Sequence, residues 1–274
     1  MGLFKDYVSQ TRKPEGFLGK IMLKGMNSGH AKMADWGLRH LQNINPENII
    51  DLGCGGGRNA GELLKKYPNA NVTAVDYSEL SVKKAREYNR EMIEAGRCTV
   101  QQGDVSALEL PDSAYDLATA FETIYFWPGL TDCFSEVARV LRPGGYFMIC
   151  NESDGTDAAS LKFEKIIEGM KNHTVEEITA ALKEAGFSKV KSFHHKGKIY
   201  DRRVSPGDRS SVWQLPPSPR AVRSYCRMNR QACCSRRFSV SWACEKTIVF
   251  SHVFFLFVET NLIFPKKSII PLTP

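Results

Sequence analysis

The stretch Ile49-Ile50-Asp51-Leu52-Gly53-Cys54-Gly55-Gly56-Gly57 decides the fold of this chain. An apolar run rich in β-branched residues ends at an acid, four glycines then fall within five residues, and a helical pattern follows. Glycine has no Cβ, so the backbone can turn sharply there and come close to a ligand. A strand, a glycine turn and a helix in that order predict a nucleotide-sized crevice at the carboxyl end of a parallel strand.

The acid before the glycines separates two classes of ligand. Dinucleotide sites carry the fingerprint G-x-G-x-x-G and hold a pyrophosphate at the helix N-terminus. Here Asp51 is followed by glycines at positions 53, 55 and 57. A carboxylate at that place repels a pyrophosphate, but it attracts a cationic ligand that bears an amino acid group. The spacing therefore favours the second class.

Two further predicted strands also end in acids. Val72 to Asp76 reads as the second strand, and a carboxylate at its end can accept both hydroxyls of a ribose. Thr99 to Asp104 reads as the third strand. Three acids at three strand ends form a constellation that is more specific than one glycine loop.

These motifs resemble those of the class I S-adenosylmethionine-dependent methyltransferases. The matching pieces keep the family's order and span about residues 45 to 195: Asp51–Gly57, Val75–Ser78, Gly103–Val105, Tyr115–Leu117 and Leu141–Gly145. The resemblance implies an α/β fold, a Rossmann-like, doubly wound, mostly parallel seven-stranded sheet with helices on both faces. It says little about the substrate.

The resemblance also implies that S-adenosylmethionine is the cofactor. Asp51 then attracts its ammonium, directly or through water, while the backbone at Gly53 and Gly55 approaches its methionine part. Asp76 binds the ribose hydroxyls, and Asp104 with Val105 meets the adenine. The whole expected cofactor set is Asp51, Gly53, Cys54, Gly55, Asp76, Tyr77, Gly103, Asp104, Val105 and Glu122.

Methyl transfer from a sulfonium demands no invariant catalytic group, because the leaving group is already activated. The candidates for catalysis are Glu122 and His30 as a base and Tyr125 as an orienting hydroxyl. Glu122 can equally be a structural or cofactor-contacting carboxylate, and His30 a surface or capping residue. The aromatic run from Tyr125 to Trp127 follows a strand directly, which predicts that part of it forms a pocket wall.

The function predicted from these residues is methyl transfer to a small-molecule acceptor by in-line displacement. No Asn/Asp-Pro-Pro-aromatic motif follows the predicted fourth strand, Tyr115 to Phe121, and no Pro-Cys pair occurs, so the methylation of DNA bases is disfavoured. Residues 1–200 carry 25 Lys and Arg against 26 Asp and Glu, which gives a nucleic acid backbone little to bind. A catalytically inactive cofactor-binding protein stays open, as does an NAD-dependent oxidoreductase, which Asp51 disfavours.

Composition indicates a soluble globular protein with no membrane partner, at 42% hydrophobic and 24% charged residues. No apolar segment of a signal peptide follows Met1. None of the eight cysteines has the C-x-x-C spacing of a zinc or redox site, which favours free thiols and a cytoplasmic location. His194 and His195 are adjacent on a predicted strand and point to opposite faces, so no metal is expected.

We expect a buried fifth strand over 146–150, a sixth over 189–195, and helices over about 60–67, 79–95, 131–141 and 158–171. Ser78 is the expected N-cap of the second of these, and Thr174 with Glu177 forms a capping box that opens a further helix. The fold then needs one more antiparallel strand beside the fifth.

The predicted domains are an N-terminal helical cap over 1–45, the cofactor-binding domain over 46–200, and a basic, atypical tail over 201–274. From Arg202 to Arg237 the tail has nine arginines and no lysine. A nucleic-acid arm, a zinc knuckle and a segment with no evolved role compete as interpretations. We favour a foreign or out-of-frame extension beyond about Arg203. Alternatively, Ile248 to Val258 supplies the missing strand or exposes an aggregation-prone segment.

Overall fold

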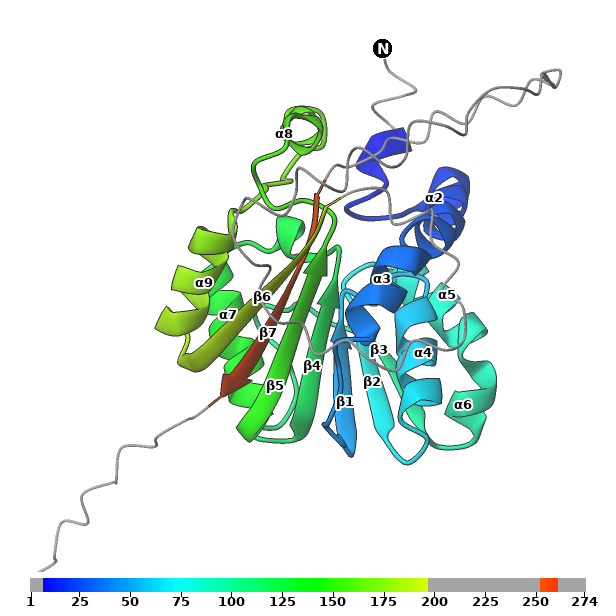
Figure 1. Cartoon of the computed structure of the whole chain (residues 1–274). Helices are drawn as coiled ribbons and strands as arrows, with labels where there is room; N and C mark the ends of the chain where they lie inside the picture. The colour runs from blue at the N-terminus through cyan, green and yellow to red at the C-terminus, as the bar shows by residue number, and fades with distance from the viewer. Residues whose placement is uncertain (1–6, 197–251, 261–274) are drawn as a thin grey trace, which may run out of the picture. The chain divides into compact units, whose positions relative to one another are not determined.

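The computed structural model describes residues 7–196 and 252–260 of the chain. Five parallel strands form the centre of its sheet in the order β3-β2-β1-β4-β5 (Figure 1). They are β1 (Asn48–Leu52), β2 (Asn71–Asp76), β3 (Cys98–Gln102), β4 (Tyr115–Phe121) and β5 (Leu141–Asn151). The chain runs outward from β1 to β3 and then returns to β4 on the other side of β1. This reversal creates the switch point at which ligands bind in open α/β sheets.

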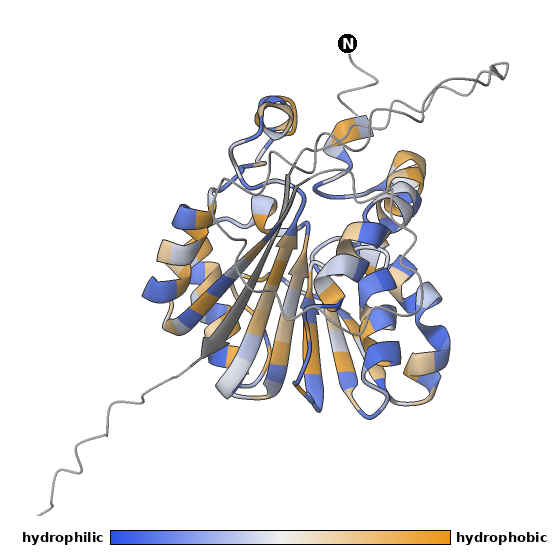
Figure 2. Cartoon of the chain, viewed as in Figure 1, coloured by the Kyte–Doolittle hydropathy of each residue, from blue (hydrophilic) through white to orange (hydrophobic). Residues whose placement is uncertain are grey.

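The predicted cover of helices on both faces of the sheet is confirmed. Neighbouring residues of β1 belong to different cores, because side chains alternate between the faces of a strand: Ile49 packs into one core and Ile50 into the other. The Ile49 core includes α3 (Ala31–Leu38) and α4 (Arg58–Lys66). The Ile50 core includes α7 (Leu130–Val140) and α9 (Val175–Glu184). Figure 2 shows hydrophobic residues concentrated on the central strands.

Local capping rules account for several helix boundaries. Ser78 caps α5 (Glu79–Tyr88) by accepting a hydrogen bond from the Ser81 N–H. The capping box of Thr174 and Glu177 opens α9 as predicted.

The single helix expected over 79–95 is wrong. Asn89 separates α5 from α6 (Arg90–Glu94), and its buried amide donates to the carbonyls of Gly57 and Ala85. The helix expected over 158–171 is also too long. α8 ends at Glu164, and Glu164 then accepts hydrogen bonds from the backbone and side chain of Asn172.

Two antiparallel pairings extend the sheet beyond β5. β7 (His252–Thr260) lies between β5 and β6 (Phe187–Lys196), with Leu256 opposite Ile149 on one side and Ser192 on the other. This is the position in which the sequence requires an antiparallel strand, and β7 overlaps the alternative segment Ile248 to Val258. The extension predicted beyond Arg203 falls mostly on residues 197–251 and 261–274, which lie outside the described residues, so it stays a prediction.

The N-terminal segment contributes α2 (Gly16–Gly29) and α3, which meet at His30. α2 lies beyond the carboxyl ends of the parallel strands (Figure 1). Among the described residues, no helix combines the length and the apolar character that crossing a membrane requires.

Candidate functional site

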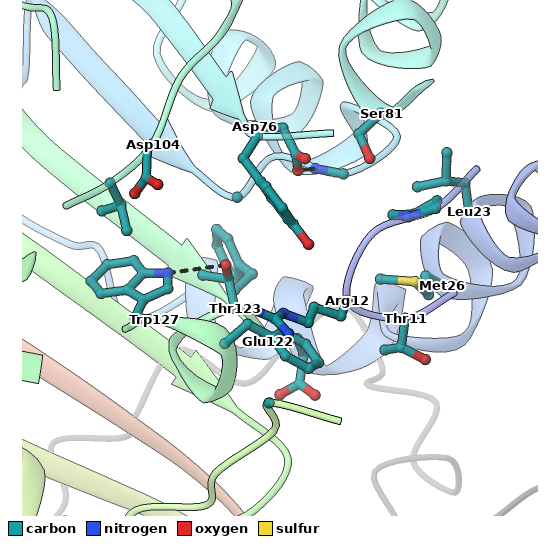
Figure 3. Close-up of a pocket in the computed structure, with 18 of the residues that line it drawn as sticks. Thr11, Arg12, Leu23, Met26, Asp76, Ser81, Asp104, Glu122, Thr123 and Trp127 are labelled. Carbon is teal, nitrogen blue, oxygen red and sulfur yellow. Dashed lines mark hydrogen bonds between the residues drawn. The ribbon is translucent and has the colours of Figure 1, made fainter. Parts of the chain in front are cut away.

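A cavity of about 500 Å³ opens at the carboxyl ends of the central strands. Figure 3 shows Leu23 and Met26 of α2 across this cavity from Trp127. Residues from the glycine turn, three strand ends and the N-terminal segment line it, among them Thr11, Arg12, Leu23, Met26, Gly53, Gly55, Asp76, Tyr77, Asp104, Val105, Glu122, Thr123, Phe126, Trp127 and Lys171. Its size lies within the range of small-molecule sites.

The glycine turn is held against the end of β2. The N–H groups of Gly53 and Cys54 both donate to the Val75 carbonyl, at 2.8 and 3.0 Å. Gly53 has φ +72°, and a Cβ there would overlap the Thr123 hydroxyl. Gly55 has φ +52°, and a Cβ there would meet nothing within 4 Å. The turn therefore presents bare backbone to the cavity at Gly55.

Asp76 lines the cavity in a fixed orientation. Its Oδ2 accepts from the Gly55 N–H at 2.8 Å and its Oδ1 from the Ser78 N–H at 2.9 Å. Burial raises the pKa of this carboxyl, and the two backbone hydrogen bonds oppose that rise. The same contacts tie the end of β2 to the glycine turn, so both parts of the site keep one geometry.

Asp51 lies behind the turn with 1% of its surface exposed. Its Oδ1 accepts from the Thr119 hydroxyl at 2.7 Å, whereas its buried Oδ2 has no hydrogen-bond partner among the described residues. Burial, above all, raises the pKa of Asp51 to about 7, and the neighbouring Asp76 charge adds to the effect. A buried acid with one unsatisfied oxygen beside bare backbone fits a cationic ligand group.

We expect the stability of the cofactor-free protein to depend on pH through Asp51. Folding raises its pKa from 3.8 to about 7, so the folded chain binds the proton more tightly than the unfolded chain. The resulting stability is fully present below about pH 4 and is lost as the pH rises to about 7. The uncharged Asp51→Asn variant lacks this loss.

Urea denaturation between pH 4 and 8 measures the effect as the difference between the wild type and Asp51→Asn. That difference should change across the acidic range and level off above pH 7. Asp132→Asn, at an exposed position on α7, is the control. A wild-type-minus-variant difference that is the same at every pH would contradict the assignment.

The three predicted catalytic residues lie close together, and of these three Glu122 lines the main cavity. Tyr125 donates from its hydroxyl to Glu122 Oε1 at 3.2 Å, and the Glu152 N–H donates to the same oxygen. His30 Nδ1 lies 3.6 Å from Glu122 Oε2 and 3.6 Å from Glu152 Oε1. Glu152 directly follows the last residue of β5.

Burial sets the protonation of this group. Burial raises the pKa of Glu122 well above its ordinary range, and the charge of Glu152 raises it further. Burial also raises the pKa of Glu152, to about 7. Burial lowers the pKa of His30 to about 4, so its imidazole is neutral at pH 7. The ring of His30 as a whole is 31% exposed, but its Nδ1 atom is buried.

The predicted site residues differ in whether they line the main cavity, line a recess beside it or lie behind it. Gly53, Gly55, Asp76, Tyr77, Asp104, Val105 and Glu122 line the cavity directly. Cys54 and His30 line a smaller recess beside it, which shares Gly53, Gly55 and Glu122 with the main cavity. Gly103 supports the site from behind by donating to the Asp76 carbonyl, and Tyr125 is buried behind Glu122.

Several lining residues carry no motif that sequence reasoning could use. Arg12 and Lys171 reach the cavity from segments far apart in the chain. Thr123 accepts a hydrogen bond from the Trp127 indole at 3.3 Å, which fixes the aromatic wall (Figure 3). The wall expected from the aromatic run is formed by Phe126 and Trp127.

Comparison with known proteins matches residues 49–145 to the family model described as a methyltransferase domain. The chain is 27% identical to the sterol 24-C-methyltransferase erg-4 of Neurospora crassa, over 54% of this chain and 40% of that protein. It is 30% identical to the malonyl-[acyl-carrier protein] O-methyltransferase of Geobacter sulfurreducens, over 57% of this chain and 61% of that protein. The chain thus spans about half the length of the curated relatives it matches.

Solved structures share the fold. A methyltransferase from Thermotoga maritima, described as a possible histamine N-methyltransferase, aligns with a TM-score of 0.56 at 16% identity, covering 94% of this chain and 100% of that one. The putative methyltransferase in a complex from Haloferax volcanii aligns with a TM-score of 0.62 at 19% identity, covering 94% and 98%.

The family match begins at β1 and contains the glycine turn together with the acids at the ends of β1, β2 and β3. S-adenosylmethionine is the cofactor of this family, and the unsatisfied oxygen of Asp51 and the bare backbone at Gly55 fit its amino acid part. Residues 49–145 of this chain match a methyltransferase domain of the S-adenosylmethionine-dependent class.

Proposed function

We propose that this protein transfers a methyl group from S-adenosylmethionine to a small-molecule acceptor by in-line displacement. The observation that carries the proposal is one cavity bounded by the glycine turn and Asp76 on one side and by Glu122 on the other. Positioning donor and acceptor in one cavity supplies most of what such a displacement needs.

Each part of the cofactor is assigned its own group of residues in and around the cavity. The backbone at Gly53 and Gly55 would lie against the methionine part of the cofactor, and the Asp51 carboxylate would attract its ammonium group. Asp76 would accept the ribose hydroxyls, since two backbone N–H groups already fix its orientation. The adenine would lie against Asp104 and Val105, with Cys54, Tyr77 and Gly103 supporting the surrounding backbone.

The bound cofactor supplies a methyl group made electrophilic by its sulfonium. The chain would hold the acceptor in line, exclude water and accept a proton where the acceptor carries one. Glu122 and the neutral His30 are the proposed proton acceptors. Tyr125 would orient Glu122 rather than the acceptor, because its hydroxyl donates to the Glu122 carboxylate.

A small organic acceptor is supported by the wall opposite the glycine turn. Leu23, Met26, Phe126 and Trp127 give that wall an apolar character. The named relatives act on chemically different acceptors, a sterol and a malonyl-[acyl-carrier protein], so their names do not define the acceptor here.

Two structural proposals accompany this function. We propose a seven-stranded sheet in which β7 is the native last strand, supported by its backbone pairing with both β5 and β6. A cytoplasmic location is supported by the four cysteines of the described region, Cys54, Cys98, Cys133 and Cys150, which are all buried free thiols.

Calorimetric titration of the full chain with S-adenosylmethionine, S-adenosylhomocysteine and NAD tests the function. We expect the first two to bind, NAD to show no binding, and Asp76→Ala to weaken binding by ~10–100-fold through the lost charged hydrogen bonds. Asp132→Ala, at an exposed acid on α7, is the matched control. Binding of NAD alone would overturn the proposal in favour of an oxidoreductase.

Turnover separates the enzyme from the inactive alternative. Formation of S-adenosylhomocysteine is measured while pools of small-molecule acceptors are added to the chain. Acceptor-dependent formation that Asp76→Ala slows supports the proposal. Cofactor binding with no turnover across chemically diverse pools would instead indicate a catalytically inactive cofactor-binding protein.

A further inference from the structure

We propose that His30, Glu122 and Glu152 together bind a divalent metal ion such as Mn²⁺, at the point where the glycine turn meets the acceptor side of the cavity. The residues come from three separate elements: His30 from the junction of α2 and α3, Glu122 from the end of β4, and Glu152 from the end of β5. Their joint placement is therefore a product of the tertiary fold.

The spacing of the three side chains suits one ion. One ligand atom from each residue lies within 4.8 Å of the other two. His30 Nδ1 lies 3.6 Å from an oxygen of each carboxylate, which is beyond a normal hydrogen bond. Ligand atoms at ~2.0–2.1 Å from a shared octahedral ion are roughly 2.8–3.0 Å apart when adjacent and ~4.0–4.2 Å apart when opposite, so small movements of these side chains would bring all three to one ion.

The unsatisfied atoms point to a ligand at the same place. His30 Nδ1 is buried and makes no hydrogen bond among the described residues. Glu122 Oε1 accepts hydrogen bonds from the Tyr125 hydroxyl and the Glu152 N–H. The other oxygen, Oε2, is the one that faces His30. One nitrogen and two carboxylate oxygens therefore face a common point.

A cation between Glu122 and Glu152 would allow both carboxylates to be charged at once. The side chains of Glu122 and Glu152 are each only 13% exposed, so both carboxylates are largely removed from water. In the region that the structure describes, neither forms an ion pair with a lysine or arginine. Two adjacent carboxylates with so little solvent can ionise together only when a positive charge lies between them.

The backbone holds Glu122 in place for this role. Its φ of +56° is in the left-handed region, which is unfavourable for a residue with a side chain. Its N–H donates to the Cys150 carbonyl at 3.0 Å, which ties the end of β4 to β5. This conformation directs the carboxylate toward His30 and Glu152 instead of along the strand.

The donor set indicates the class of ion. Carboxylate oxygens suit Mg²⁺ and Mn²⁺, imidazole suits Fe²⁺ and Zn²⁺, and none of the three ligands is a thiolate, so the mixed set indicates a divalent first-row ion, for which Mn²⁺ serves as the probe. The recess beside the cluster holds about 50 Å³ and adjoins the main cavity through Gly53, Gly55 and Glu122. An oxygen atom of the acceptor could complete the coordination there, a step that rests on the proposed methyl transfer.

Titration of the full, EDTA-treated chain with Mn²⁺ tests the site, with free Mn²⁺ followed by electron paramagnetic resonance. Mn²⁺ is the chosen probe because it prefers oxygen and nitrogen over the thiols of the eight cysteines. We expect one ion per chain, and at least ~10–100-fold weaker binding in His30→Ala and in Glu152→Gln. The control is His173→Ala, because His173 lies 3.8 Å from a single carboxylate, that of Glu177.

Urea denaturation of the same metal-free variants reports on folding, and Glu152→Gln, at a residue outside the proposed catalytic and cofactor sets, is expected to keep S-adenosylhomocysteine binding. Mn²⁺ binding that both variants lose while both unfold as the wild type does, and while Glu152→Gln still binds S-adenosylhomocysteine, supports the metal site. Wild-type chain that binds S-adenosylhomocysteine but no Mn²⁺ overturns the site and leaves the methyltransferase proposal intact. Equal Mn²⁺ binding by wild type and both variants overturns it too, because the ion is then held elsewhere.

Discussion

Gly53→Ala is expected to reduce cofactor affinity by more than ~100-fold and to destabilise the fold. Gly53 has φ +72°, and the left-handed region costs a residue with a Cβ ~1–2 kcal/mol. The added Cβ would also lie 2.7 Å from Thr123 Cβ, closer than real contacts allow, and overpacking adds ~1–3 kcal/mol. Movement of Thr123 would release the Trp127 indole, which donates to it. Both walls of the cavity would then shift.

Two other glycines separate these contributions. Gly144→Ala introduces the same kind of strain at φ +82° with nothing within 4 Å, in a part of β5 far from the glycine turn. It should cost ~1–2 kcal/mol of stability and leave cofactor affinity unchanged. Gly55→Ala, also in open space, should cost a similar amount of stability. It should also weaken cofactor binding strongly, because the added Cβ would take up space that the cofactor is proposed to fill beside the turn.

Urea denaturation and calorimetry with S-adenosylhomocysteine measure the two effects on each variant. We expect the smallest loss of affinity in Gly144→Ala, a larger loss in Gly55→Ala and the largest loss in Gly53→Ala. If Gly53→Ala and Gly55→Ala both bind S-adenosylhomocysteine within about threefold of wild type, corresponding to less than ~0.7 kcal/mol, the glycine turn is not the cofactor site.

The parts of the site that the sequence predicts well are those that one local pattern encodes. The turn from Asp51 to Gly57 requires glycine at positive φ, and a residue type with that constraint is visible in a single sequence. Asp76 could be predicted as a strand-end acid because it is the last residue of a buried strand rich in β-branched residues. The alternation of Ile49 and Ile50 between two cores likewise follows from strand geometry alone.

The parts that could not be predicted depend on tertiary contacts. Glu152 becomes a partner of Glu122 only because β4 and β5 are neighbours in register, and no motif links the two positions. Arg12 reaches the cavity from the N-terminal segment, which carries no glycine or acidic pattern. Asn89 interrupts a sequence with good helical periodicity because its amide binds the Gly57 carbonyl, a contact 32 residues distant. Such contacts override local propensity.

Leu256→Pro is expected to unfold the domain or leave it only partly folded. Leu256 lies opposite Ile149 in β5 and opposite Ser192 in β6, so its backbone belongs to a strand with neighbours on both sides. Proline has no N–H to donate and is confined to sheet edges and bulges. The unpaired carbonyl left behind costs ~1–3 kcal/mol, before any distortion of β5, whose Phe147 and Ile149 are fully buried.

Leu256→Val is the matched control, because it keeps the N–H and has a high preference for strands. Thermal denaturation should show little change for Leu256→Val and a large loss of cooperative unfolding for Leu256→Pro. A chain truncated after Arg203 should behave like Leu256→Pro, since it lacks β7 and exposes the edges of β5 and β6.

These variants also decide between the two interpretations of the C-terminal tail. A foreign extension has no reason to supply a strand in register with both β5 and β6, so the domain should be indifferent to Leu256→Pro and to truncation. If both altered chains unfold cooperatively and bind S-adenosylhomocysteine as the full chain does, β7 is dispensable and the extension hypothesis stands. If both lose folding and cofactor binding while Leu256→Val retains them, residues 252–260 belong to the methyltransferase domain, and any break in the native sequence is confined to the residues on either side of them.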